Sequence, residues 1–335
     1  MLLFCILTLV LATFGDALGL CDALIEELGE DNSLIFCDWL TNTTALSPFN
    51  NATSDITVLA FNDTGYTSIA GNDIGEEATS VQYYMVKGVH ESSSFPNISD
   101  VGDGGFRYAV LDTFLDSGRW AGRTGGQKIL AQVNYDGELE FYAGSDEIAT
   151  ALKTASRPSL STLTVDPPLS VLTAYQDIPF DGGLIHIIRN NIGPPERARD
   201  VFTNNRDNLG NVLVEALYLT GMMNEIEAAK DVTIFAPTDE AFYNVGSIFD
   251  GMTMDELKDI LGYHIVVGNV TYGATIAPVS LNWSISQTTF SGKTLELTHP
   301  QKIGSEEFYS GLRADGCYTS LLDYIIQNGN IISTE

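Results

Sequence analysis

A tyrosine and a histidine stand side by side at Tyr263 and His264, directly before the apolar run 265–267. Histidine titrates near neutral pH and often serves as a general acid or base, so this pair is the first candidate for chemistry. An aromatic residue followed by histidine at the start of an apolar strand is more often a packed, hydrogen-bonded element of a core. The sequence therefore favours a structural role, with contact to a ligand or partner as the first alternative and catalysis as the second.

A second candidate is the polar turn Thr238-Asp239-Glu240 within VTIFAPTDEAF (232–242). The β-branched and aromatic residues before the turn predict a buried strand. Pro237 ends that strand, because proline lacks an N–H donor and favours an extended residue before it. Thr238 can then cap a helix whose first turn places both acids at the positive end of the helix dipole. Folding explains the stretch, and contact with a partner is the alternative for Thr238, Asp239 and Glu240.

Other chemistry is sparse along the chain. The sequence has no G-x-S-x-G elbow, no G-x-x-x-x-G-K-[ST] loop, no H-E-x-x-H and no EF-hand loop. Acids in the glycine-rich stretch 99–112 have the wrong spacing for a calcium loop, and no cysteine–histidine cluster offers a zinc site. His186, between Ile185 and Ile187, is expected to be packed and satisfied. We therefore expect no cofactor, no metal and no assigned catalytic residue, and favour a non-enzymatic protein while leaving catalysis open.

Composition limits the classes of partner. The chain has 335 residues, 44% of them hydrophobic, which is enough for about two ordinary domains with packed cores. Its 44 acidic and 16 basic residues give a formal net charge of −28. Such a charge repels nucleic acid and anionic membrane surfaces, so we expect no nucleic-acid partner.

The N-terminus predicts secretion. Residues 1–19 combine an apolar run, too short to span a bilayer comfortably, with small residues at Ala17 and Gly19, as in a signal peptide. No hydrophobic anchor or membrane span is apparent further along the chain. N-glycosylation sequons agree with a secreted, extracellular or cell-surface glycoprotein; they begin at Asn42, Asn51, Asn62, Asn97, Asn269 and Asn282.

Cysteine usage fits the same compartment. Cys5 would leave with the signal peptide, so the mature chain would keep Cys21, Cys37 and Cys317. In an oxidising compartment the pair closest in sequence, Cys21 and Cys37, is the disulfide candidate. Cys317 would then be unpaired or would form an intermolecular bond.

The chain contains an internal repeat. The second half runs from a helical pattern at 211–226, through 232–242 and 254–268, to the apolar stretch 321–332. The first half has the same order of elements, at 33–40, 56–66, 81–88 and 181–195. We therefore expect two similar domains in tandem.

The repeated motifs resemble those of the fasciclin (FAS1) family. In the second half the strand-to-helix motif is matched by Thr233, Phe235, Ala236, Pro237, Thr238, Asp239, Ala241 and Phe242. Tyr263 and His264 match the central Tyr-His of the family, and Asn328-Gly329 open its last motif. In that family the Tyr-His region has been linked to cell adhesion and also to holding the fold together.

The first half is a divergent copy. Phe61 replaces the motif proline, Tyr66 the phenylalanine and Tyr84 the histidine, whereas residues 183–188 fit the last motif closely. The first half has a longer span between its motifs, which predicts an insertion near 95–130. The family pattern continues beyond Asn330-Ile331-Ile332, whereas this sequence stops at Glu335. Either the sequence is short, or the second domain lacks its last strand and exposes a sheet edge.

The resemblance implies an α+β fold of two tandem FAS1-like domains, each a β-sandwich or wedge flanked by short helices. The expected boundaries are 1–19 for the signal peptide, 20–196 for the divergent first domain and 197–335 for the second. The implied function is adhesion or ligand binding, with a matrix or cell-surface protein or glycan, or an apolar small molecule, as partner. The alternative is a secreted accessory protein or enzyme of a fungal secondary-metabolite pathway, such as a pigment pathway, that assists oxidative coupling or cyclisation of a polycyclic substrate. A pocket between the domains with convergent tyrosines or histidines would favour that alternative.

Overall fold

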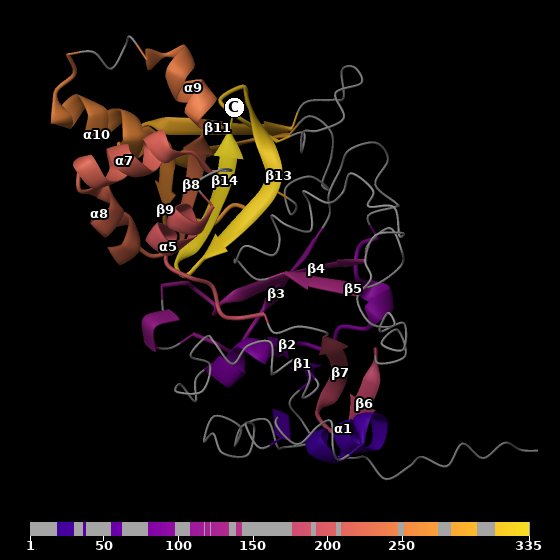
Figure 1. The fold of residues 1–335 in the computed structure, drawn as a ribbon. Coiled ribbons are helices and arrows are strands. Elements are labelled where there is room, and N and C mark those ends of the chain that lie inside the picture. The colour runs from indigo at the N-terminus through magenta and orange to yellow at the C-terminus, as the bar shows by residue number, and fades with distance from the viewer. Residues whose placement is uncertain are drawn as a thin grey trace, which may run out of the picture.

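The computed structural model describes residues 19–29, 36–37, 55–61, 80–97, 108–116, 118–120, 122–133, 139–142, 176–188, 192–205, 209–246, 251–273, 283–299 and 312–334. Below, residues 20–196 are called the first half and residues 197–335 the second half. Apart from Gly19, the predicted signal peptide lies outside the described residues, as do Asn42, Asn51, Asn62 and Asn282. The fold mixes helices with β-sheets, so the predicted α+β class is confirmed (Figure 1).

The second half is built on a seven-stranded sheet of order β10-β11-β12-β13-β14-β8-β9. Its centre is the parallel pair β8 (Val232–Pro237) and β14 (Gly329–Thr334), with every residue of both strands buried. Antiparallel β9 (Ile265–Val267) and β13 (Cys317–Ile326) flank that pair. The sheet continues through β12 (Arg313–Ala314), β11 (Thr294–His299) and β10 (Trp283–Thr288).

The first half repeats this central arrangement. Its four-stranded sheet has the order β2-β1-β7-β6, with β1 (Ile56–Phe61) parallel to β7 (Gly183–Ile188). Antiparallel β2 (Met85–Lys87) and β6 (Ile178–Phe180) lie on either side. A separate three-stranded sheet consists of β3 (Ala109–Asp112), β4 (Lys128–Val133) and β5 (Leu139–Tyr142). In Figure 1 this small sheet lies between the rest of the first half and the ends of β13 and β14.

The two central pairs match residue by residue. Ile56 is opposite Gly183 in the first half, as Val232 is opposite Gly329 in the second. A β-carbon on either glycine would lie 1.8 Å from the carbonyl oxygen of its partner, Ile56 or Val232. Each parallel pair therefore requires glycine at this position, because only a residue without a side chain permits such close approach.

A threonine in each central strand ties the neighbouring loop to the sheet. In the first half the Thr57 hydroxyl donates to the Gly88 carbonyl (2.9 Å) and accepts from the His90 N–H (2.8 Å). In the second half Thr233 donates to the Asn269 carbonyl (2.9 Å) and accepts from the Thr271 N–H (2.8 Å). The predicted repeat is thus visible in hydrogen bonds as well as in strand order.

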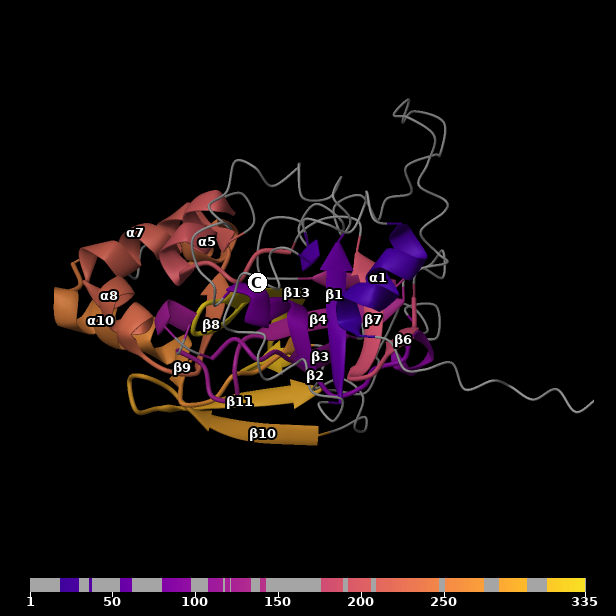
Figure 2. The same ribbon diagram turned by 90° about the horizontal axis from the view of Figure 1, so that it is seen from below.

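Helices gather on one side of the second half, away from the first (Figures 1 and 2). They are α5 (Ala198–Asn204), α7 (Asn211–Leu219), α8 (Met222–Ala228), α9 (Asp239–Asn244) and α10 (Met254–Tyr263). The periodicity at 211–226 indicates one helical segment, but the structure breaks it at Gly221, whose φ is 73°. Leu219, assigned to the apolar face by that periodicity, is 65% exposed at the end of α7.

At the start of the first half, α1 (Leu20–Leu28) lies beside β6, and Cys21 is joined to Cys37 by a disulfide with a Cα–Cα distance of 5.7 Å. Short 3₁₀ helices follow along the chain: η2 (Ser80–Tyr84), η3 (Ser92–Ser94) and η5 (Gly118–Trp120). Cys317 is free and exposed.

The two halves differ in the length of one hairpin. Thr113 and Gln127 close it in the first half by a backbone bond of 2.9 Å, as Thr289 and Lys293 do in the second at 2.8 Å. The connecting residues are 114–126, here called the arm, against only 290–292 in the second half. The arm falls within the predicted insertion at 95–130. The first half is also longer between Gln127 and Gly183 than the second is between Lys293 and Gly329, so the extra length is divided.

The expectation of an open edge at the C-terminal strand is wrong for the described sheet. β14 lies between β13 and β8, so residues 329–334 form no edge. Thr334 faces Pro237 at the end of the parallel pair, and its carbonyl accepts a bond of 3.0 Å from Thr238. The order of the strands in the sheet does not follow their order in the sequence, because β14 is the last strand along the chain and yet lies in the middle of the sheet.

Substituting Gly329 tests the close approach in the second half. We expect Gly329→Ala to lower the free energy of unfolding by at least about 1–3 kcal/mol, because the added methyl group forces the central strands apart. The matched control is Gly246→Ala, where an added β-carbon would have no atom within 4 Å. Thermal unfolding followed by circular dichroism measures both, and equal melting temperatures for the two variants would contradict this account.

Candidate functional site

Tyr263 and His264 lie where α10 passes into β9. Thr253 starts this helix with a capping box: its hydroxyl accepts from the Glu256 N–H, and the Glu256 carboxylate accepts from the Thr253 N–H. His264 follows the last helical residue, and its carbonyl accepts a bond of 2.8 Å from the Phe235 N–H on β8. The helix end and the central strand therefore fix the backbone of the pair.

The Tyr263 side chain is held by its hydroxyl group. That oxygen lies 3.1 Å from the Thr294 carbonyl oxygen and donates to the Asp315 carboxylate. The bond to Asp315 raises the pKa of Tyr263 to about 12, since a carboxylate acceptor favours the protonated phenol, and burial adds to the effect. Tyr263 is therefore a neutral hydrogen-bonding group at physiological pH.

The pair borders a hollow of about 500 Å³, lined by Ile260, Tyr263, His264, Lys293 and Thr294. We call this surface the hollow. Burial lowers the pKa of His264, so its imidazole is neutral at pH 7. Lys293 is half exposed, and its ammonium lies 2.5 Å from the Asp259 carboxylate. The hollow thus offers apolar surface, two neutral polar rings and one cation at its rim.

The geometry gives His264 no catalytic partner in the described parts of the chain. Its ring stacks edge-on against Tyr263, with centroids 6.2 Å apart, and makes no hydrogen bond to another described residue. A histidine that activates a nucleophile is normally hydrogen-bonded to it and oriented by a third group. Among the described residues, no group of three histidine, cysteine or acidic side chains is placed to hold a metal ion. The arrangement is suited to contact and hydrogen bonding.

The other predicted candidates serve mainly the fold. Thr238 caps α9 by accepting from the Ala241 N–H, and Asp239 accepts a bond of 2.9 Å from Val212 at the start of α7. Glu240 is exposed. None of the three turn residues lines the hollow, so the two sets of predicted contact residues remain separate in the described structure.

Two glycosylation sequons are among the described residues. Asn269 is exposed directly after β9. Asn97 is partly buried and forms an isolated β-bridge with Val133. Their glycosylation stays a prediction.

His186 is packed as expected. Its Nδ1 accepts from the Asp177 N–H (3.4 Å), so Nε2 carries the proton and donates to the His90 carbonyl (2.8 Å). The Ser92 hydroxyl donates to the Asp177 carboxylate rather than to the imidazole, so this serine is not activated by His186. Burial lowers the pKa of His186, and the His90 carbonyl and the Asp177 charge partly oppose that shift.

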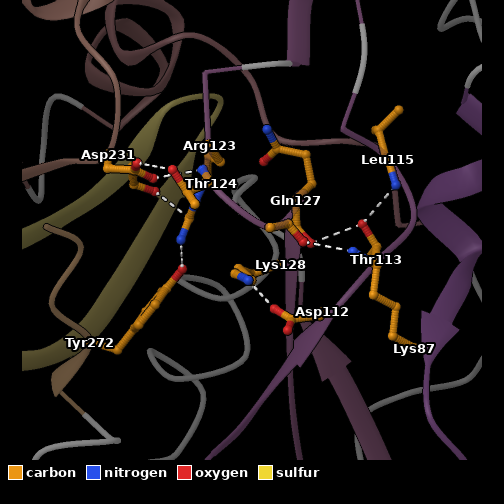
Figure 3. A network of polar contacts seen from close by, with 12 residues as sticks. Lys87, Asp112, Thr113, Leu115, Arg123, Thr124, Gln127, Lys128, Asp231 and Tyr272 are labelled. Atoms are coloured by element: carbon orange, nitrogen blue, oxygen red, sulfur yellow. Dashed lines mark hydrogen bonds and ion pairs between the residues drawn. The ribbon is translucent and has the colours of Figure 1, made fainter. Parts of the chain in front are cut away.

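A second feature, which the motifs did not reveal, joins the two halves. Arg123 on the arm is buried, donates 3.1 Å to the Gly329 carbonyl and also donates to the Tyr272 hydroxyl (Figure 3). The next residue, Thr124, donates from its N–H to the Asp231 carboxylate (2.8 Å). The Asp231 N–H in turn donates to the Gly122 carbonyl (3.1 Å). The arm is therefore hydrogen-bonded to the N-terminal ends of β8 and β14.

Apolar contacts reinforce the same junction. A buried cluster combines residues of both halves: Tyr108, Leu130, Tyr142, Tyr272 and Ile325. The Tyr142 hydroxyl also accepts a bond of 2.8 Å from the Gln132 side chain. The described tyrosines between the halves are packed together and 6–7% exposed, so they do not line an open pocket. The only sequence signal for this junction was the extra length of the first half.

Comparison with known proteins supports the resemblance. Residues 210–309 match the fasciclin domain family. The second half of the chain therefore contains a fasciclin domain. Its relatives include a fasciclin-like arabinogalactan protein of Cercospora beticola, 29% identical over 52% of this chain and 44% of that protein. Another, of Arthroderma benhamiae, is 25% identical over 81% of this chain and 58% of that protein. The chain thus spans about half the length of these curated relatives.

A FAS1 domain pair from the insect cell adhesion molecule fasciclin I was found among solved structures, at 12% identity and a TM-score of 0.36, covering 90% of this chain and 94% of that one. The fasciclin match lies in the second half and includes the strand-to-helix motif, Tyr263 and His264. The boundaries 20–196 and 197–335 stay predictions. In the described parts of the chain, no helix has both the length and the apolar character needed to cross a membrane.

Removing Arg123 tests the junction between the halves. We expect Arg123→Ala to lower the free energy of unfolding by about 1.5–3 kcal/mol, because the change removes charged hydrogen-bond donors and leaves the Gly329 carbonyl without this partner. The control is Arg197→Ala, an exposed arginine whose side chain does not cap α5. Urea denaturation measures both variants; an effect of Arg123→Ala no larger than that of the control would show that the bond carries no net stability.

The lowered pKa of His186 predicts a pH dependence. Protonation favours the unfolded state, so the stabilising contribution of neutral His186 is present above about pH 6.5 and is lost as pH falls towards the lowered folded pKa. We compare wild type with His186→Gln, whose amide can still donate to the His90 carbonyl and does not titrate. The stability advantage of wild type should shrink below about pH 6.5. An advantage that is constant across thermal unfolding at different pH values would refute the assignment.

Proposed function

We propose that this fasciclin-family protein is a secreted glycoprotein that binds an extracellular partner through the hollow, without catalysis. The observation that carries the proposal is the Tyr263–His264 pair, held by α10 and β8 at the border of a partly apolar hollow. A partner gains more from a fixed surface than from a mobile one, because less conformational entropy is lost on binding. The partner class is a matrix or cell-surface protein or glycan, or an apolar small molecule.

Several features support a function outside the cell. The predicted signal peptide, the sequons and the Cys21–Cys37 disulfide are all typical of secreted proteins. The curated relatives are named as fasciclin-like arabinogalactan proteins of fungi. The strongly negative charge suits a soluble surface that avoids nonspecific contact with nucleic acid.

The alternative role, in a secondary-metabolite pathway, would draw support from tyrosines lining a pocket between the halves. Tyr108, Tyr142 and Tyr272 do converge there, but each is nearly fully buried in the shared cluster. Their described arrangement stabilises the junction and favours no substrate site. We therefore propose the binding role ahead of this alternative.

Adhesion of cells or matrix proteins to the immobilised protein tests the proposal. His264→Ala should reduce adhesion because it removes one wall of the hollow, and Tyr263→Phe should have a smaller effect because it keeps the ring but loses the bond to Asp315. Tyr243→Ala is the control, since Tyr243 is 75% exposed on α9 and is not among the residues that line the hollow. Circular dichroism verifies the fold of each variant. Undiminished adhesion by well-folded His264→Ala protein would remove the hollow from the binding surface.

A further inference from the structure

The hollow has a counterpart in the first half. Strand register matches Lys87 with Val267, which places Tyr83-Tyr84 at the positions of Tyr263-His264. The same contact is present in both copies: the Tyr83 hydroxyl donates 3.0 Å to the Lys128 carbonyl, and the Tyr263 hydroxyl lies 3.1 Å from the Thr294 carbonyl. The two surfaces are therefore equivalent positions of the internal repeat.

In the first half this position is covered. Tyr83 and Tyr84 have no exposed surface. Gln127, which corresponds to Lys293 in the shared hairpin, is also fully buried. Its side-chain amide donates to the Trp120 carbonyl of the arm (2.8 Å) and to the Gln327 carbonyl of the second half (2.7 Å). The side-chain donor at the position of Gln127 is thus satisfied in part by a backbone carbonyl of the arm that covers it.

The arm supplies apolar side chains as well as that carbonyl. Leu115 is fully buried and Trp120 is 3% exposed, and both belong to the same core cluster as Tyr83 and Tyr84. Large apolar side chains on a covering loop bury much area, and tryptophan is the residue most enriched at binding hot spots. The first half therefore shows what kind of segment fits this position.

The second half has the surface without its cover. The turn 290–292 replaces the arm, and Phe290 remains 40% exposed. Lys293 is exposed at the position of Gln127 and can donate from its ammonium to a backbone carbonyl. The hollow of about 500 Å³ is wide open to solvent, so a side chain of another protein can reach it without any rearrangement of the described lining.

We propose that the hollow receives a loop of a partner protein that presents a tryptophan, by analogy with the arm, whose Trp120 carbonyl contacts the equivalent position of the first half and whose Trp120 side chain is buried in the same core cluster. This inference rests on the proposed function and specifies its partner: a protein loop, rather than a glycan or a free small molecule. The inserted side chain packs against Ile260 and Tyr263, and a carbonyl of the loop accepts from Lys293. The first-half surface is unavailable to such a loop because its own arm and the second half occupy it.

The chain's own arm provides the probe. A fluorescent peptide of residues 114–126 is titrated with the full-length protein at about 0.15 M salt, which screens attraction between the basic peptide and the acidic protein. Fluorescence anisotropy should show saturable binding, weakened at least about tenfold by replacing the peptide's Trp120 with serine. On the protein, Ile260→Asp should weaken binding to a similar extent, whereas Tyr243→Ala should leave it unchanged.

A peptide of the same composition in scrambled order controls for charge, and circular dichroism confirms that Ile260→Asp folds. If that variant does not fold, Lys293→Glu, a substitution at the exposed rim, replaces it and should weaken binding in the same way. Absent binding, equal binding of the scrambled peptide, or binding that none of the hollow substitutions changes would overturn the inference.

Comparison with the adhesion assay separates the two proposals. Adhesion that depends on His264, together with no binding of the arm peptide, would overturn the protein-loop inference and leave the proposed function in place. Peptide binding at the hollow without any cell or matrix adhesion would support the inference and contradict the adhesive role. Competition of the peptide for adhesion would support both.

Discussion

A close parallel strand pair at the centre of each half fixes the placement of the neighbouring elements. β8 and β14, like β1 and β7, come from distant parts of the sequence and meet at a glycine that leaves no space for a side chain. The threonines Thr57 and Thr233 then fix the loops beside these pairs. Because the second-half pair is fully buried and the first-half pair is buried over most of its described length, their register decides where the neighbouring elements are placed.

The junction between the halves is built on the same central strands. Arg123 and Thr124 reach the starts of β14 and β8 in the second half, where backbone carbonyls and the Asp231 carboxylate are available. An arginine almost without solvent exposure needs such acceptors, since a buried charge without hydrogen bonds is costly. The arm, a hairpin connection of the first half, is thus a contact that holds the second half in place.

The equivalent surfaces at Tyr83-Tyr84 and Tyr263-His264 differ in exposure between the two copies. In the first copy the hairpin is longer, and Tyr83 and Tyr84 are buried at the position where the arm and the second half meet. In the second copy the turn is short and the hollow is open at the same position. The equivalent surface is therefore part of the junction between the halves in one copy and open in the other.

Local patterns in the sequence were enough to indicate the fasciclin resemblance, the α+β class and the order of repeated elements, because the motif VTIFAPTDEAF and the last motifs specify local strand and turn chemistry. It indicated that Thr238 begins a helix, and the structure shows that cap. Local patterns did not indicate the break at Gly221 or the central position of β14, since packing against distant strands decides both. Tertiary packing brings Arg123 and Tyr272 together, and it covers Tyr83 while leaving Tyr263 at the border of a hollow. The physical reason is that such contacts depend on how two copies dock, whereas sequence motifs encode mainly the fold within each copy.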